Sequence, residues 1–257
     1  MAKATGRRRK TLQRGSMEET QSVIPFPMKK SRVRKTMDSA NEEYIDSKST
    51  HQPLVCKTPA QKRYLQAMMS SDITFCTGIA GCGKTYVSLK FACELLEKRL
   101  IERIIVTRPA VGVEEDLGAL PGEVADKCRP WFQPALDVLN AHFGASHVEG
   151  MCKVERIKFV PMAYLRGLSF KNSFILLDEA QNATPRQIMT LMTRMDQGSK
   201  LVIDGDPEQC DLRTPSGLHD AIRRLQNVEG ISFCTFDLND IQRHKLVRDI
   251  ILAYRNP

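Results

Sequence analysis

The eight residues from Gly78 to Thr85 restrict what this chain can fold into more than any other stretch of the sequence. They read GIAGCGKT and fit the phosphate-loop pattern G-x-x-x-x-G-K-[ST] at every fixed position. An apolar run over Ile73–Thr77 precedes the loop, and apolar residues at helical spacing over Val87–Leu96 follow it. Strand, glycine loop and helix, in that order, form the context that the pattern requires, so we expect a nucleoside-triphosphate site here.

The physical chemistry of the loop assigns roles to its residues. Glycines let successive backbone N–H groups face the phosphates, and the helix that follows directs its partial positive charge at them. We expect Lys84 to contact the β- and γ-phosphates and the Thr85 hydroxyl to bind Mg²⁺. A glycine-rich turn that binds nothing is the alternative, and Cys82 is interpreted as a tolerated small residue rather than a redox switch. The expected nucleotide-binding residues are Gly78, Ile79, Ala80, Gly81, Cys82, Gly83, Lys84 and Thr85.

Two acidic residues, Asp178 and Glu179, follow the apolar run Phe174–Leu177. Ligands of open α/β sheets bind at the carboxyl ends of the strands, so a buried strand that ends in such a pair indicates a site. We expect Asp178 to bind Mg²⁺, directly or through another ligand, and Glu179 to be the base that orients the attacking water. An ordinary solvated acidic turn is the alternative.

A third apolar run, Leu201–Ile203, is followed by polar residues up to Gln209. In sites of this type such a strand end places a polar side chain near the γ-phosphate, and Gln209 is the expected sensor. A plain strand-to-turn junction is the alternative.

These runs belong to a longer alternation of apolar and helical segments. A short helix is expected after Thr58 and Pro59, which have the residue types of a helix cap and a first helical position. Such alternation predicts an α/β fold of the RecA-like P-loop NTPase class, with a parallel sheet covered by helices on both faces. Further expected strands cover residues 104–107 and 231–236, and further expected helices cover 184–194 and 218–226.

Positive charge is concentrated in the first part of the chain. Residues 1–36 contain 11 Lys and Arg against two Glu, a net of +9, whereas the other 221 residues contain 27 against 28 acidic residues. Because residues 1–52 also lack periodic hydrophobicity, we expect a flexible basic arm there and one ATPase domain over residues 53–257. The arm suits binding to RNA or other single-stranded nucleic acid, and a solvated tail is the alternative.

Cysteine spacing and hydropathy bear on the compartment. The eight cysteines include no CxxC pair, and no apolar stretch reaches the roughly 18–20 residues that a membrane span needs. Cysteines inside apolar runs, such as Cys76 and Cys93, are typical of buried free thiols in a reducing compartment. We therefore expect a cytoplasmic protein that does not enter a membrane.

Several further stretches occur in the order found in one family, and the chain resembles the PhoH-like ATPases, whose cores are related to superfamily 1 helicases. The resemblance spans about residues 55 to 255. It rests on the phosphate loop and on Thr58–Gln61, Thr107–Val111, Leu117–Gly122, Ala163–Gly167, Leu177–Asn182 and Gln242–His244.

The resemblance implies roles that the residues alone do not give. It implies that Gln61 reads the adenine edge, which favours ATP over GTP, and the sequence contains no N/T-K-x-D guanine-binding motif. It also implies a ring-forming homo-oligomer, with a hexamer as the working hypothesis, in which Arg243 approaches the γ-phosphate of a neighbouring subunit. An arginine finger of this kind supplies charge to the transferring phosphoryl group. A solvent-exposed Arg243 or a local salt bridge is the alternative.

From these features we expect a Mg²⁺-dependent ATPase that couples hydrolysis to the binding or unwinding of RNA or other single strands. About 50 residues follow Asp204, too few for a second helicase core, so translocation would need an oligomer. A nucleotide or small-molecule kinase that uses residues 112–150 as its substrate site is one alternative. A nucleotide-regulated assembly module with little turnover is the other.

Overall fold

The structure, a computed structural model, describes residues 53–109 and 129–255. The predicted basic arm, residues 1–52, lies outside the described residues. Residues 110–128 lie outside them too, and these include residues 112–128 of the segment that the kinase hypothesis uses. Within the two described ranges, no helix has both the length and the apolar character needed to cross a bilayer.

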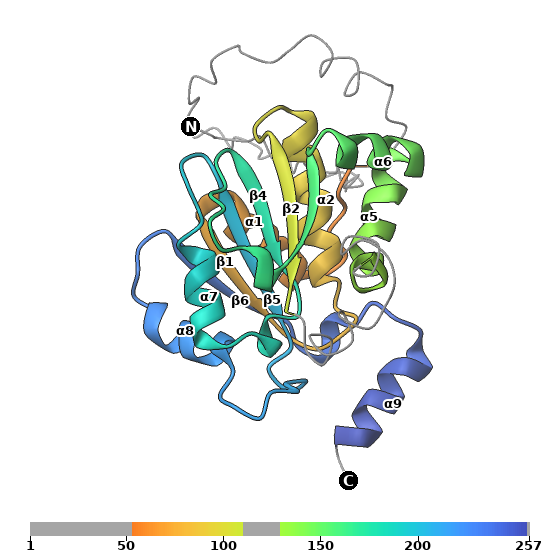
Figure 1. The fold of residues 1–257 in the computed structure, drawn as a ribbon. Helices are drawn as coiled ribbons and strands as arrows, with labels where there is room; N and C mark the ends of the chain where they lie inside the picture. The colour runs from red at the N-terminus through yellow and green to blue at the C-terminus, as the bar shows by residue number, and fades with distance from the viewer. Residues whose placement is uncertain (1–52, 110–128, 256–257) are drawn as a thin grey trace, which may run out of the picture. The chain divides into compact units, whose positions relative to one another are not determined.

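Six strands within the described residues form one parallel sheet (Figure 1). They are β1 (Ile73–Thr77), β2 (Arg103–Arg108), β3 (Ile157–Pro161), β4 (Ser173–Leu177), β5 (Lys200–Gly205) and β6 (Ile231–Thr235). Their order across the sheet is β3-β2-β4-β5-β1-β6. Every residue of β4 and β5 is buried, as expected for parallel strands covered on both faces. Five of these strands agree with the sequence-based predictions, whereas β3 was not predicted.

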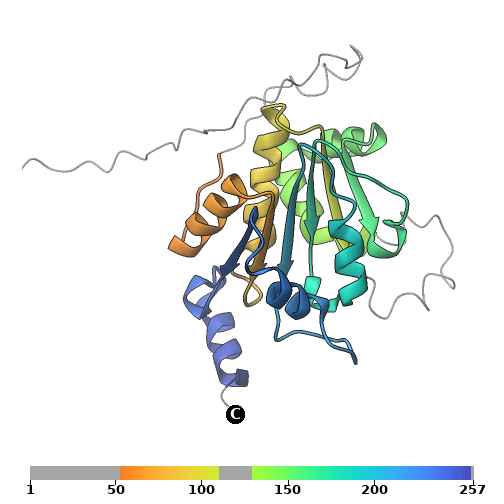
Figure 2. The same ribbon diagram turned by 90° about the vertical axis from the view of Figure 1, so that its left-hand side faces the viewer.

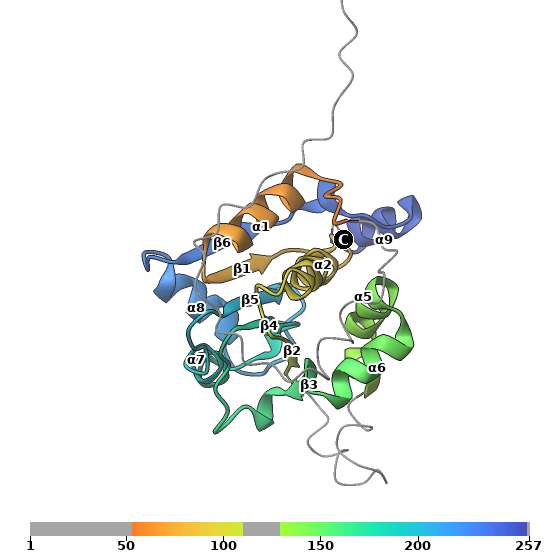
Figure 3. The same cartoon turned by 90° about the horizontal axis from the view of Figure 1, so that it is seen from above.

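Helices cover both faces of the sheet, as Figure 3 shows. On one face lie α1 (Pro59–Ser70), α2 (Lys84–Glu97), α5 (Gln133–Phe143) and α6 (Ala145–Lys153). On the other face lie α7 (Pro185–Met192) and α8 (Gly217–Leu225). The short 3-10 helices are η2 (Arg129–Phe132), η3 (Met162–Tyr164), η4 (Ala180–Asn182) and η5 (Leu238–Asp240). The parallel sheet with helices on both faces confirms the predicted fold class.

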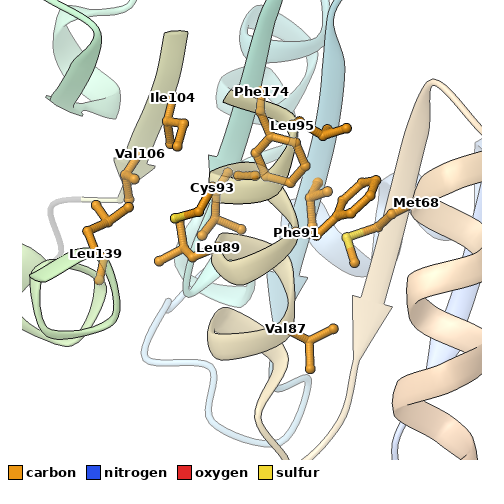
Figure 4. Close-up of a cluster of buried hydrophobic side chains, with 14 of the residues drawn as sticks. Met68, Val87, Leu89, Phe91, Cys93, Leu95, Ile104, Val106, Leu139 and Phe174 are labelled. Carbon is orange, nitrogen blue, oxygen red and sulfur yellow. The ribbon is translucent and has the colours of Figure 1, made fainter. Parts of the chain in front are cut away.

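The strand side chains alternate between two core clusters, one under each helical layer. In β4, Phe174 packs in the cluster under α2, whereas Leu177 packs in the cluster under α7 and α8. Figure 4 shows the first cluster, where Phe91 of α2 meets Phe174 edge to face with ring centroids 6.1 Å apart. Burial of one side chain of this size contributes roughly 1.5–3 kcal/mol. The helix that follows the phosphate loop is therefore held firmly against the sheet.

The chain connections place the phosphate loop at the carboxyl edge of the sheet. The connection from β1 to β2 passes through α2 on one face, whereas that from β5 to β6 passes through α8 on the opposite face. Ligands of open α/β sheets bind outside the carboxyl ends where connections diverge in this way. After β6 and η5 the chain forms α9 (Lys245–Arg255), which extends from this same edge (Figure 2).

Candidate nucleotide-binding site

The phosphate loop leaves the carboxyl end of β1 and runs into the first turn of α2. Gly83 is the N-cap residue of α2 and has a φ of 85°, a left-handed conformation that glycine adopts without strain. Gly78 faces the chain after β6, because a Cβ built on it would lie 2.7 Å from the carbonyl oxygen of Phe236. The loop thus leads into the N-terminus of a 14-residue helix, whose partial positive charge favours an anion at this position.

The middle of the loop packs inward. Ile79 and Cys82 are buried and Ala80 is half-buried. The Cys82 thiol donates to the carbonyl oxygen of Asp237 over 3.7 Å, and burial raises the pKa of this thiol. A raised pKa disfavours the reactive thiolate, which agrees with a structural Cys82 rather than a redox switch.

Lys84 folds back over the loop that precedes it. Its ammonium group donates to the carbonyl oxygens of Gly78 at 2.7 Å and Ile79 at 3.0 Å. An ammonium group has three donor hydrogens, so these two bonds leave a third for a phosphate oxygen. The Lys84 ammonium group therefore lies beside the phosphate loop, and its contact with the β- and γ-phosphates stays a prediction.

Thr85 and Asp178 meet at the junction of the loop and the end of β4. The Thr85 hydroxyl donates to an Asp178 carboxylate oxygen over 3.0 Å. Burial raises the pKa of Asp178, and the Glu179 charge adds to the rise. The charges of Arg108 and Lys84 and the hydrogen bond from Thr85 oppose it. Hydroxyl and carboxylate oxygens are ligands that Mg²⁺ accepts together with substrate phosphates, so this pair fits the expected cation.

Glu179 has a strained backbone and two side-chain partners. Its φ is 56°, a left-handed value that is unusual for a residue other than glycine. One carboxylate oxygen accepts from Arg108 at 2.9 Å and the other accepts from Gln181 at 2.6 Å. Sequence reasoning assigned no role to Arg108 or Gln181, although both lie in stretches that carry the family resemblance.

A buried carboxyl group lies behind the loop and was also missed. Asp204 of β5 is fully buried and accepts from the Tyr64 hydroxyl at 2.5 Å and from Ser88 at 3.3 Å. Burial raises the pKa of Asp204 to about 7; the Tyr64 hydrogen bond opposes this rise and the Asp178 charge increases it. Because Ser88 also bonds the backbone of the first turn of α2, this network ties the loop helix to β5.

The two predicted glutamines lie in different environments. Gln61 is 3 % exposed, and its side-chain amide donates to the carbonyl oxygen of Cys82 at 3.0 Å and accepts from the Lys57 backbone at 2.7 Å. The structure therefore brings Gln61 to the phosphate loop. Gln209 lies in the turn after β5, where its backbone N–H donates to Asp206 and its side chain is exposed.

Arg243 lies against the phosphate loop of its own chain. A Cβ built on Gly81 would be 2.7 Å from the Arg243 Nε atom, and the backbone N–H of Gln242 donates to the Gly81 carbonyl oxygen at 3.0 Å. The structure thus brings Arg243 to the phosphate loop of its own chain. The expected role of Arg243 toward the γ-phosphate of a neighbouring subunit stays a prediction.

The fold and this site together define a P-loop NTPase. A family model described as "PhoH-like protein" matches residues 53–255, and the chain belongs to that family. It is 38% identical to a PhoH-like protein of Bacillus subtilis over 240 residues, which cover 93% of this chain and 75% of the relative. It is 40% identical to Protein PhoH of Escherichia coli K12 over 213 residues, which cover 81% of this chain and 60% of the relative.

Two solved structures are also similar to this chain. The large terminase of a thermophilic bacteriophage matches with a TM-score of 0.46 and 12% identity, covering 78% of this chain and 50% of that chain. The Pif1 helicase of Candida albicans matches with a TM-score of 0.38 and 16% identity, covering 72% of this chain and 40% of that chain.

Proposed function

We propose that this chain is a Mg²⁺-dependent ATPase. The observation that carries the proposal is the 3.0 Å hydrogen bond between Thr85 and Asp178. This contact joins the phosphate-binding end of the site, at Lys84, to its hydrolytic end, at Glu179. The chain therefore contains, on its own elements, the groups that bind phosphates and a carboxylate that can activate water.

The proposed reaction uses each of these groups in turn. The loop N–H groups and Lys84 bind the β- and γ-phosphates, while Thr85 and Asp178 would hold Mg²⁺, which supplies positive charge to the phosphate oxygens when bound. Glu179 orients a water molecule and accepts its proton as the water oxygen bonds to the γ-phosphorus. The bond from that phosphorus to the β–γ bridging oxygen breaks, and ADP and phosphate are released.

Three further residues have proposed roles near the nucleotide. Arg243 supplies charge to the γ-phosphate, and its packing on Gly81 supports this role. Gln61 reads the adenine edge, for which its amide would exchange at least one of its present protein partners. Gln209 senses the γ-phosphate from the turn after β5.

Hydrolysis is proposed to serve RNA or another single-stranded nucleic acid. The support is the charge distribution, since residues 1–36 have a net charge of +9 and the remainder of the chain is close to neutral. Several phosphate contacts by such a segment give strong salt dependence.

A homo-oligomer, with a hexameric ring as the working hypothesis, is proposed as the active form. The support lies in α9, where Leu246, Ile250 and Tyr254 are 59%, 48% and 88% exposed. Their spacing of four residues places them on one face of the helix, and apolar faces of this kind mark interaction surfaces. Light scattering of the wild type and of a Leu246→Glu, Ile250→Glu variant tests this, and an unchanged mass in the variant counts against it.

One experiment separates the ATPase from its alternatives. Phosphate release from ATP is measured without any added acceptor, with and without single-stranded RNA, at two salt concentrations. Release without acceptor excludes an obligatory kinase, and stimulation by RNA that weakens with salt supports the coupling. A variant that combines Arg7→Ser, Arg8→Ser, Arg9→Ser and Lys10→Ser is expected to lose the stimulation and keep the basal rate. No release above background would contradict the proposal.

A further inference from the structure

The carboxylate of Glu179 is held from two sides. Its Oε1 accepts from Arg108 Nη2 at 2.9 Å, and its Oε2 accepts from Gln181 Nε2 at 2.6 Å. Its backbone also has a left-handed φ of 56°, a conformation that persists only where the surroundings over-determine it. Glu179 is therefore fixed in one orientation by the protein rather than free to sample rotamers.

Gln181 is the better anchored of the two partners. Its side chain is buried, at 1 % exposed, and its Oε1 accepts from the Asp206 backbone N–H at 3.0 Å. Its carbonyl oxygen accepts from Ser216 at 2.8 Å and from Cys210 at 3.3 Å. The amide of Gln181 thus links Glu179, at the end of β4, to the turn that follows β5.

Arg108 holds the other oxygen from the end of β2. Its Nη1 donates to the carbonyl oxygen of Trp131 at 2.6 Å, while its Nη2 donates to Glu179. The side chains of Arg108 and Glu179 are 25% and 37% exposed, so the pair is partly exposed to solvent rather than buried in the core. A guanidinium group that donates to two fixed acceptors can move little without breaking one of these hydrogen bonds.

Such a clamp matters because a general base acts only at the correct geometry. Each carboxylate oxygen has two lone pairs, so a bond from Gln181 or Arg108 leaves a second lone pair for water. Without the clamp, the Glu179 side chain gains rotational freedom, and the reactive orientation becomes a minor one.

We propose that Gln181 and Arg108 are positioning residues that aim the Glu179 carboxylate at the attacking water; this rests on the proposed ATPase function. Gln181 suits the task because an amide donates to Glu179 and accepts from the Asp206 N–H at once. A carboxylate in its place would keep only the acceptor and would set a like charge beside Glu179.

The test uses Gln181→Met, Gln181→Glu and Arg108→Lys in the full chain. We expect kcat for ATP to fall roughly 10- to 100-fold in the two Gln181 variants, and less in Arg108→Lys, which keeps the charge. The dissociation constant of a fluorescent ATP analogue stays within about twofold, since no phosphate contact changes. Gln187→Met, which removes the capping box of α7, and Arg224→Lys, on an exposed pair of α8, are matched controls that keep kcat.

A second measurement separates positioning from general damage to the fold. In a Glu179→Gln background, Gln181→Met should lower the residual rate no further, because it acts only through Glu179. The positioning role is wrong if the Glu179→Gln, Gln181→Met double variant loses as much kcat as the two single losses multiplied together. It is also wrong if kcat is unchanged in Gln181→Glu and Arg108→Lys. If Glu179→Gln alone keeps full turnover, the proposed role of Glu179 fails, and the positioning role fails with it. Thermal melts of each variant identify those that fold, and the partly exposed Arg108→Lys remains informative if Gln181→Met does not.

Discussion

The hydroxyl of Thr85 donates to a carboxylate oxygen of Asp178 over 3.0 Å, joining the first turn of α2 to the end of β4. The two residues are 93 positions apart in the sequence, and the parallel sheet brings their elements to one edge. The Thr85 hydroxyl oxygen and the Asp178 carboxylate oxygen, which share this hydrogen bond, are also the two oxygens that we expect to bind Mg²⁺.

Replacing Thr85 tests the cation role directly. Thr85→Val has nearly the same shape but no hydroxyl, so ATP binding in the presence of Mg²⁺ should weaken by roughly 10-fold or more, while binding in EDTA changes little. Thr85→Ser, which retains the hydroxyl, serves as the control. Titration of a fluorescent ATP analogue with and without Mg²⁺ measures both values. Equal losses in the two conditions would count against a cation role.

The buried carboxyl of Asp204 predicts a specific pH dependence of stability. Its folded-state pKa is raised to about 7, so its contribution to stability is fully present below the unfolded pKa of about 4 and is lost as pH rises through 7. Asp204→Asn keeps an acceptor for Tyr64 but cannot ionise. Between pH 5 and pH 8 the wild type should therefore lose on the order of 2 kcal/mol more unfolding free energy than the variant.

Urea denaturation at the two pH values gives this difference. Titrating groups that do not interact with Asp204 change equally in both proteins, so the comparison reports the ionisation of Asp204 together with its effect on neighbours such as Asp178. The same loss in the wild type and in Asp204→Asn would show that this carboxyl does not titrate in the range.

A side chain at Gly78 should destabilise the fold, because it would collide with the backbone after β6. A Cβ at Gly78 would lie 2.7 Å from the Phe236 carbonyl oxygen, on backbone that cannot rotate away. Gly78→Ala should lower the unfolding free energy by roughly 1–3 kcal/mol and weaken ATP binding. Gly167→Ala is a matched control, because Gly167 also has a positive φ, of 80°, but its Cβ would meet nothing within 4 Å. Thermal melts and ATP titrations of both variants distinguish crowding from backbone strain.

Mixing two inactive variants shows which subunit supplies Arg243. Because Arg243 packs on Gly81 of its own chain, a mixture of Arg243→Ala and Lys84→Ala proteins should recover no ATPase activity. Recovery to a sizeable fraction of the wild-type rate would mean that the arginine of one subunit serves the loop of its neighbour. Pre-mixing under dissociating conditions ensures that the subunits exchange.

The elements that carry the motifs could be predicted from the sequence, because local pattern and chemistry agree there. The loop Gly78–Thr85 requires a strand before it and a helix after it, and both were found. By contrast, α5 and α6 were missed: Pro134 opens the first, Gly150 interrupts the second, and Gly144 separates them.

The hydrogen-bond partners of side chains in the site could not be predicted from the sequence, because they depend on tertiary contacts that no local pattern encodes. Gln181 bonds the backbone of Asp206, 25 residues further along the chain, and Asp204 bonds Tyr64 across 140 residues. Both are polar residues that a local pattern would assign to a turn or a strand end. Only the packing of β4, β5 and α1 shows that they are buried and paired.

The central claim, that this site hydrolyses ATP with Glu179 as the base, is tested most directly by Glu179→Gln. The substitution keeps the shape and removes the basic oxygen, so ATP binding should stay within about twofold of the wild type while phosphate release falls roughly 100-fold or more. Both quantities are measured on the same preparation of this chain with Mg²⁺ present. Retained binding with lost turnover is the predicted result, and unchanged phosphate release would contradict the account.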